Sequence, residues 1–555
     1  MTERFFCVLV LILQIVLPPV VGTAFADIQA EGVELKSPLT ETLDWHVPLS
    51  QDVPLQATDS LPEILHTQKG GQFQKFADVF FVPENPNLAE LVGDSEVSVL
   101  ADAGWQFVKN LDENQATSED LARPVAESNL SESIRAGRSF NRESLAALAR
   151  TEQAKAKTGQ ALALLLPSAT INVNSGYETS VPASVIDEDT GLLVSEDTHT
   201  RIDVSFSLRQ SLFDLPGFLD WRRRKVLEQA SGESYRVSDS DAYISTVNAY
   251  LSLVSSRLQA DITRDFEVQL AELLSYIEKR TSAGAASISD MSRVRARIEE
   301  TLSSRLEQES AHATAGIEFV RLTNLVPEKV LLPKPEDIGA SLVAKSFDVS
   351  VSKAMVSNPE IAAIRAELQA AKIDQSIATG RYLPRVDAEF TDVYAKGAGG
   401  DKSSQRDQRY MMVLNWNLLR GGLDRQVSFE RSARYKELQY RLDDQRRRVV
   451  QALSANYMSL STTRGRIAAG YQELKSIATA AEAMSKRMLS GNQSLLDLLD
   501  VYDRFFRVRS RLVSLHVQEM NAVAQLVRLT QGTPWSSSEG PPSASTKNQV
   551  YSSIN

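Results

Sequence analysis

The feature of this sequence that most constrains its fold is an internal duplication. An alanine-rich stretch at 145–167 ends in a Leu-Pro pair, and a similar stretch at 362–384 ends in a second one. At a constant spacing of 217 residues, Ala146, Ala149, Ala154, Lys155, Ala161, Leu166 and Pro167 recur as Ala363, Ala366, Ala371, Lys372, Ala378, Leu383 and Pro384. Such self-similarity indicates that two parts of the chain share one structural plan.

The same order of landmarks continues at a spacing of 207 residues. The landmarks of the first copy are Tyr250, Gly284, Ser287 and Asp290, and those of the second are Tyr457, Gly491, Ser494 and Asp497. The sequence therefore predicts two structural repeats, at 128–326 and 345–531. A proline-rich connector at 327–344 separates them.

Each repeat reads as a helix, two strands, a long helix, a turn and a returning helix. The first helix of each repeat, about 144–164 or 358–381, ends at a Leu-Pro pair. Because proline cannot continue a helix, an extended segment is expected to follow it. No proline occurs at 217–326 or 385–533, which leaves room for long helices.

The predicted strands alternate between apolar and polar residues, most clearly at 202–209 and 410–418 and more weakly at 171–173 and 386–390. That period is typical of a sheet with one apolar face. Its members, which we expect on the outer face of a barrel, are Ile202, Val204, Phe206, Leu208, Tyr410, Met412, Leu414 and Trp416. The alternation alone suits either a transmembrane barrel or a half-buried soluble sheet.

The expected helix lengths add a second constraint. A helix over 218–281 is about 96 Å long, whereas helices over 288–324 and 140–164 are about 55 Å and about 37 Å. Two short helices stacked end to end therefore equal the long one, which predicts a wall of even height. Four strands cannot close a barrel, since about eight are needed, so membrane-embedded strands require several chains to share one.

A targeting segment is expected at the N-terminus. Residues 5–16 are largely apolar and Ala24-Phe25-Ala26 follows, which predicts a signal peptide at 1–26. Cys7, the single cysteine, lies in that segment, so disulfides and cysteine chemistry are excluded from the mature chain.

Composition excludes several classes of function. The 60 Lys and Arg against 71 Asp and Glu give a net charge of −11, which argues against nucleic acid as a partner. The five histidines are scattered, and neither a phosphate loop nor a nucleophile elbow is present. We therefore expect no enzyme activity, no metal and no cofactor.

Doubled and in this order, the landmarks resemble the TolC family of outer-membrane channel proteins over 128–531. The resemblance is carried by Leu166-Pro167, Leu383-Pro384, Asn358-Pro359-Glu360, the turn Leu418-Leu419-Arg420-Gly421-Gly422 and the paired Gly-x-x-Ser-x-x-Asp turns. It implies a mostly α homotrimer, with a long α-helical coiled-coil tunnel and four β-strands per protomer that form a shared transmembrane β-barrel. It also implies contact with outer-membrane lipid of a Gram-negative bacterium, and two partners, a periplasmic adaptor (membrane fusion protein) and an inner-membrane transporter.

Within that family, the segment Gly284-Ala-Ala-Ser287-Ile-Ser-Asp290-Met-Ser-Arg293-Val-Arg295-Ala-Arg297 is similar to members that serve type I protein secretion. Channels for drug efflux are the alternative. A periplasmic coiled-coil scaffold that forms no channel is a further one, and it would explain the helices but not the duplicated strands.

The paired turns allow a local and a functional interpretation. Locally, each glycine suits the left-handed end of a helix, each serine an N-cap and each aspartate the third position of a capping box. By resemblance, the same turns are where the family docks its adaptor. The residues concerned are Gly284, Ser287, Asp290, Gly491 and Ser494.

Two aspartates are candidates for a periplasmic entrance gate. The family has aspartate rings there, and these correspond to Asp497 and Asp500; helix capping and a solvated helix face are the alternatives. In a trimer they would form two rings of three carboxylates that favour cations. The family also latches its entrance with a tyrosine and an arginine, but Met488 and Gln493 stand at those positions. The closed state is therefore expected to be held differently.

Three segments have no settled role. Residues 27–127 form an N-terminal extension, either laid along the body or binding a partner. The tail 532–555 is rich in Ser and Pro and is expected to be disordered. The run Trp221-Arg222-Arg223-Arg224-Lys225 follows a predicted strand and is either an anchor at a membrane rim or a solvated helix face.

Overall fold

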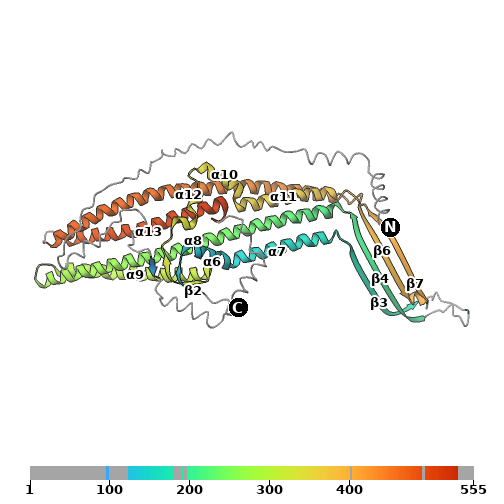
Figure 1. Cartoon of the computed structure of the whole chain (residues 1–555), viewed down its shortest axis with the longest axis horizontal. Coiled ribbons are helices and arrows are strands. Elements are labelled where there is room, and N and C mark those ends of the chain that lie inside the picture. The colour runs from blue at the N-terminus through green and yellow to red at the C-terminus, as the bar shows by residue number, and fades with distance from the viewer. Residues whose placement is uncertain are drawn as a thin grey trace. The chain divides into compact units, whose positions relative to one another are not determined.

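A computed structural model describes residues 96–98, 123–180, 191, 197–400, 403–489 and 494–534, all within a unit that spans residues 70–555 (Figure 1). The predicted signal peptide, most of the predicted extension 27–127 and all but the first three residues of the predicted tail 532–555 lie outside these ranges. Of the helices that are described, none combines the length and the apolarity that crossing a membrane requires.

The first half of the described chain is mostly helical. Its helices are α6 (Leu130–Phe140), α7 (Arg142–Ala163), α8 (Leu215–Ser282) and α9 (Ile288–Thr323). The helices predicted over 144–164, 218–281 and 288–324 are confirmed within three residues at each end. Asn141 separates α6 from α7, because its extended backbone ends α6 while its side chain accepts from Ser144 N at 2.9 Å to cap α7.

The second half repeats this plan. Its helices are α10 (Phe347–Ser357), α11 (Pro359–Gly380), α12 (Leu423–Leu489) and α13 (Leu495–Gln531). Asn358 does here what Asn141 does in the first half: it ends α10 and caps α11 by accepting from Ile361 N at 3.0 Å. Pro359 follows at the first helical position, where its missing N–H costs nothing.

The four predicted strands form one antiparallel sheet. They are β3 (Ser168–Ser180), β4 (Asp197–Phe213), β6 (Arg385–Lys396) and β7 (Ser404–Asn415), in the order β3-β4-β6-β7, with a short 3-10 turn at Ala398–Gly400. The last strand was predicted over 410–418, but β7 begins earlier, at Ser404, and ends earlier, at Asn415, which pairs with Arg385. The next partner of β7 would be Pro384, which has no N–H to donate. Trp416 instead donates from Nε1 to the carbonyl of Tyr382 at 3.0 Å.

A second, smaller sheet was not predicted. In it β5 (Leu325–Leu331) pairs antiparallel with β1 (Glu96–Ser98) and parallel with β2 (Arg123–Ser128). The predicted connector 327–344 is thus partly a strand, and two 3-10 turns follow it at Pro335–Ile338 and Ala340–Leu342. Of its prolines only Pro327 lies in β5, and it is tolerated because β1, the described neighbour on that side, pairs only with residues 329–331, which leaves β5 an edge strand there at Pro327.

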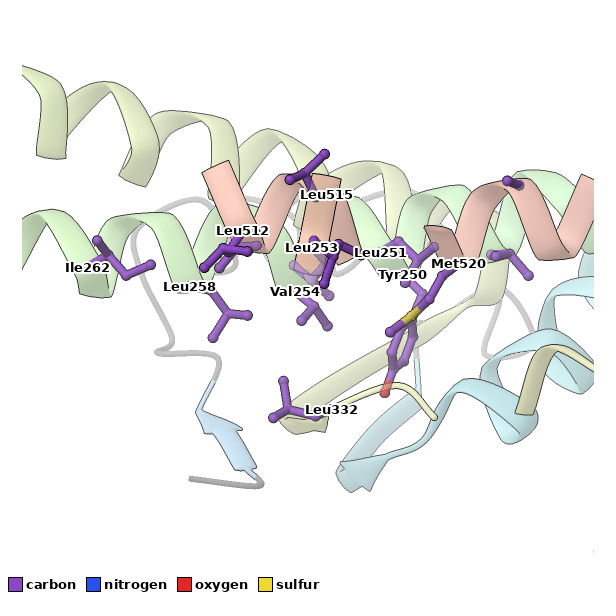
Figure 2. Close-up of a cluster of buried hydrophobic side chains, with 14 of the residues drawn as sticks. Tyr250, Leu251, Leu253, Val254, Leu258, Ile262, Leu332, Leu512, Leu515 and Met520 are labelled. Atoms are coloured by element: carbon purple, nitrogen blue, oxygen red, sulfur yellow. The ribbon is translucent and has the colours of Figure 1, made fainter. Parts of the chain in front are cut away.

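The core lies between the long helices. α8 packs against α9, α12 packs against α13, and α13 also packs on α8. Figure 2 shows apolar side chains of α8 and α13 meeting in this core, among them Leu253, Leu258, Leu512 and Leu515, all at most 2% exposed. Tyr250 is fully buried and donates to the carbonyl of Leu331 at 2.6 Å, which fastens β5 to α8.

Candidate functional site

The turn between α8 and α9 is a tight helix-to-helix reversal built around Gly284. Its φ of 72° is the left-handed conformation that the sequence predicts for this position. The turn satisfies two carbonyls at the end of α8, since Gly284 N donates to Thr281 O at 3.0 Å and Ala285 N donates to Arg280 O at 2.8 Å. No atom within 4 Å would meet a Cβ at Gly284, so backbone conformation alone requires glycine here.

Ser287 is the N-cap of α9, as predicted, but the predicted capping box does not form. The Ser287 hydroxyl accepts from Ser289 N at 3.1 Å rather than from the N–H of Asp290. The carboxylate of Asp290 instead lies 3.4 Å from the guanidinium of Arg293, one turn further along the helix. That ionic partner replaces the backbone N–H that a capping box would supply.

The turn between α12 and α13 is described only in part, because Gly491 and Gln493 lie outside the described residues. Ser494 is the N-cap of α13, although its side chain makes no capping hydrogen bond in the described structure. Asp497 lies in the first turn, where the positive helix end favours a carboxylate. Asp500 is 52% exposed and pairs with Arg504 at 2.9 Å, so its charge is partly compensated.

Near these turns, α8 is joined to the end of α12 through a backbone carbonyl. Tyr276 Oη donates to Met488 O at 3.2 Å, and Arg280 Nη1 donates to the same oxygen at 3.4 Å. Arg280 also donates to Ala285 O at 3.2 Å and lies over the Tyr276 ring. Sequence reasoning missed both donors because a main-chain acceptor leaves no motif; a tyrosine and an arginine four residues apart were the available signal.

A second link joins the two hairpins through side chains. Arg297 of α9 pairs with Asp503 of α13, and both side chains are mostly buried, at 29% and 17% exposed. Burial alone would lower the pKa of Arg297, but Glu300 and Asp503 together raise it, so the guanidinium stays charged. Asp503 also accepts from Arg507.

A third link lies further from the turns, between α8 and α13. Phe266 stacks on Phe506 with ring centroids 4.5 Å apart, and Arg509 lies 3.4 Å from Asp265. Burial raises the pKa of Asp265 and lowers that of Arg509. The two hairpins are therefore held together at three successive levels, by hydrogen bonds, by an ion pair and by an aromatic contact.

The four-stranded sheet has one apolar and one charged face, as the alternation predicts. Cross-strand partners place the predicted outward residues on one face, where Tyr410, Met412 and Leu414 are 79%, 62% and 61% exposed. Leu208 is 37% exposed, and Ile202, Val204 and Phe206 are partly covered. Trp416, beyond the last strand, is 54% exposed.

The opposite face of the sheet carries ion pairs. Arg209 and Arg385 both pair with Asp387, at 2.6 and 3.0 Å, and Arg209 also approaches Glu389 at 3.3 Å. One ion pair, between Asp392 and Arg406, lies on the apolar face instead and was not predicted. Within the described ranges, no three His, Cys, Asp or Glu side chains are placed to hold a metal ion.

Comparison with known proteins relates this arrangement to outer-membrane proteins. The family described as "Outer membrane efflux protein" matches residues 350–532. The chain is 22% identical, over 58% of its length, to the alkaline protease secretion protein AprF of Pseudomonas aeruginosa, and 20% identical, over 56%, to the outer membrane protein TolC of Escherichia coli. It spans 68% and 65% of these relatives, about two thirds of their lengths.

The fold is that of solved outer-membrane proteins. The structure of VceC from Vibrio cholerae superposes with a TM-score of 0.62 at 15% identity, covering 73% of this chain and 97% of VceC. At that identity the similarity concerns the fold alone.

Proposed function

The chain belongs to the TolC family of outer-membrane efflux proteins, and from that premise we propose that it is the exit duct of a tripartite transporter, most specifically one for type I protein secretion. It passes substrate from an inner-membrane transporter and a periplasmic adaptor across the periplasm and the outer membrane. It does no chemistry itself, and the transporter supplies the energy.

The two-faced sheet is the observation that carries this proposal. An exposed apolar face suits lipid, and a face of ion pairs suits an aqueous lumen. Four strands with open edges cannot stand in lipid alone. Three chains supply twelve strands, which is enough to close a barrel, so the proposed unit is a homotrimer.

The entrance lies at the ends of the helical hairpins. In the trimer, Asp497 and Asp500 form two carboxylate rings. Arg504 pairs with each Asp500 and so weakens the negative potential of the Asp500 ring. The closed entrance is held by contacts between hairpins, from Tyr276 and Arg280 to the Met488 carbonyl and from Arg297 to Asp503. These contacts take the place of the tyrosine and arginine that the family uses.

The adaptor docks at the same turns. The turn around Gly284, with Ser287 and Asp290, is the better described half of that surface, and Gly491 with Ser494 is its counterpart in the second repeat. An exposed turn fixed by glycine conformation and by capping offers a rigid shape to a partner.

Single-channel conductance in a planar bilayer tests the channel and its entrance together. We expect discrete, cation-selective steps whose selectivity falls in Asp497→Asn/Asp500→Asn. The matched control is Asp444→Asn, because Asp444 is also exposed and pairs with an arginine four residues on, but lies far along α12 from the turn. If none of the proteins gives conductance steps, the scaffold that forms no channel is favoured. If Asp444→Asn changes the selectivity as much as the double variant does, the assignment of Asp497 and Asp500 to the entrance is wrong.

Secretion and drug efflux are separated by the cargo. The resemblance to a protease secretion protein favours type I secretion, and the outer-membrane efflux family favours small molecules as the alternative. In a strain deleted for this gene, loss of a secreted protein from the medium supports the first. Increased drug sensitivity with normal secretion supports the second.

A further inference from the structure

A charged pocket of about 130 Å³ lies between α8, α11 and α12. Asp220 and Arg223 line it from α8, and Asp374 and Arg431 line it from α11 and α12. Arg381, the C-cap of α11, also lines it. The volume equals roughly four waters at about 30 Å³ each, which suits one small ion rather than an extended substrate.

Arginines outnumber carboxylates in this pocket. Asp220 accepts from Arg223 at 2.5 Å and from Arg224 at 3.1 Å. Asp374 accepts from Arg223 at 3.0 Å and lies 4.0 Å from Arg431. Two carboxylates are therefore shared among three guanidinium groups.

Two further observations favour an anion as the ligand of this pocket. The Nε of Arg223 is buried, and no described residue accepts a hydrogen bond from it. Within the described ranges no carboxylate pairs with Arg381. The pocket thus has donors and positive charge to spare, and guanidinium groups match the oxygens of a phosphate group better than those of any neutral ligand.

The pocket lies close to where the helices meet the sheet. Arg223 is eight residues after the start of α8 at Leu215, about 12 Å along the helix, and Arg381 is four residues before β6 begins. Apolar side chains are exposed at the same junction, with Leu383, Leu418 and Leu419 at 47%, 71% and 93%.

An aromatic pair beside the pocket has the composition of a membrane interface. Phe218 contacts Trp221 with ring centroids 5.6 Å apart, and Lys225 lies over the Trp221 ring. Aromatic rings and cations together are typical of the level of lipid headgroups.

We propose that this pocket, named here the collar pocket, binds a phosphate group through Arg223, Arg381 and Arg431. In the membrane that group belongs to a phospholipid whose acyl chains lie against the exposed leucines. Only the lipid source rests on the proposed function, because the pocket would also bind phosphate in a protein that is no channel.

Isothermal titration calorimetry of the purified full chain with inorganic phosphate, and separately with dihexanoyl-phosphatidylglycerol, tests the proposal. We expect both to bind wild type, with the lipid binding more tightly. Arg431→Gln should weaken both by about tenfold or more, because a charge-assisted contact is lost. Asp374→Asn should strengthen both, because a negative charge leaves the pocket. Effects of opposite sign are not produced by misfolding.

Arg446→Gln is the matched control. Arg446 lies on the same helix as Arg431 and also has an aspartate oxygen at 4.0 Å, but it lies outside the collar pocket. Absence of phosphate binding to wild type, or equal weakening by the control, overturns the collar pocket. Binding of phosphate without lipid overturns the lipid source. Bilayer conductance of the same proteins reports separately on the proposed channel.

Discussion

The hairpins α8–α9 and α12–α13 follow one plan, but equivalent positions 207 residues apart carry different charges. Arg293 of the first hairpin corresponds to Asp500 of the second. The start of α9 is rich in arginine and the start of α13 is rich in aspartate, and the two meet where Arg297 pairs with Asp503. The duplicated backbone supplies helices of matching length, and the diverged side chains make the two copies complementary rather than identical.

The same contrast holds within each hairpin. In the first, Arg264 pairs with Glu309 at 3.3 Å in partial exposure. At the equivalent positions of the second, Tyr471 and His516 form a buried hydrogen bond of 3.1 Å. One copy is stabilised by charge near solvent and the other by a neutral pair in the core, so the two should respond differently to mutation and to pH.

Removing the charge that joins the hairpins should have the largest effect. Asp503→Asn leaves the Arg297 guanidinium without its partner across the interface. A pair that is partly exposed loses less than the roughly 3–5 kcal/mol of a fully buried one, and we expect about 2 kcal/mol. Hydrogen exchange measured by mass spectrometry should then be about thirtyfold faster in α13 around this residue. The exposed Asp444→Asn is the control, and unchanged exchange in Asp503→Asn would show that the link contributes nothing.

Packing separates the copies next. A Cβ at Gly470 would lie 2.8 Å from Cδ2 of the fully buried Leu512, whereas the first hairpin has Thr263 at the equivalent position. Moving the packed leucine costs up to about 3 kcal/mol, whereas alanine in the middle of α12 gains about 1 kcal/mol of helix propensity. Gly470→Ala should therefore destabilise the protein by about 1–2 kcal/mol in total. Thermal unfolding of Gly470→Ala beside Thr263→Ala tests this. Equal shifts in the two variants would mean that the copies are packed alike.

The hydrogen bond to the Met488 carbonyl should contribute less. Tyr276→Phe removes one donor and leaves the ring and Arg280 in place. We expect a loss of about 1 kcal/mol, which corresponds to about fivefold faster exchange at the end of α12. Tyr440→Phe is the control, because Tyr440 lies on α12, where the exchange is measured, and is 76% exposed. A similar increase in both variants would contradict a specific role for Tyr276.

The smallest effect is a dependence of the second hairpin on pH. Burial lowers the pKa of His516 below its usual 6.5, and Glu519 at 4.0 Å opposes this only in part. The other groups facing it are the Tyr471 hydroxyl and Arg464, which pairs with Glu519. Because the unfolded chain binds the proton more readily, stability is complete above about pH 6.5 and falls as the pH drops toward the lowered pKa.

Thermal unfolding between about pH 5 and pH 8 measures this contribution of His516 to the pH dependence of stability. The wild type should lose stability toward the acid end more steeply than His516→Gln, which cannot titrate there. Parallel curves would show that His516 does not contribute to the acid sensitivity.

The long helices and strands could be predicted from the sequence, whereas pairings between segments far apart in the chain could not. The helices and the four long strands follow from proline placement and from alternation, which are local. The sheet of β1, β5 and β2 was not predicted because its strands are short and come mostly from the extension and the connector, on either side of the first repeat. At the turns, the left-handed Gly284 was predictable, but the Asp290 partner and the donors to Met488 depend on side-chain positions that no spacing encodes.

The parallel pairing of β2 with β5 has a consequence for how such a chain is assembled. Arg123 N donates to Asn324 O at 2.9 Å, so the first and last residues of the first half touch each other. The polypeptide therefore leaves the first half beside the point at which it entered, because β5 runs parallel to β2. A second copy that follows β5 begins beside the start of the first copy, so no long segment is needed to connect the two. A unit whose entry and exit lie side by side can therefore be followed by a second copy after only a short connection.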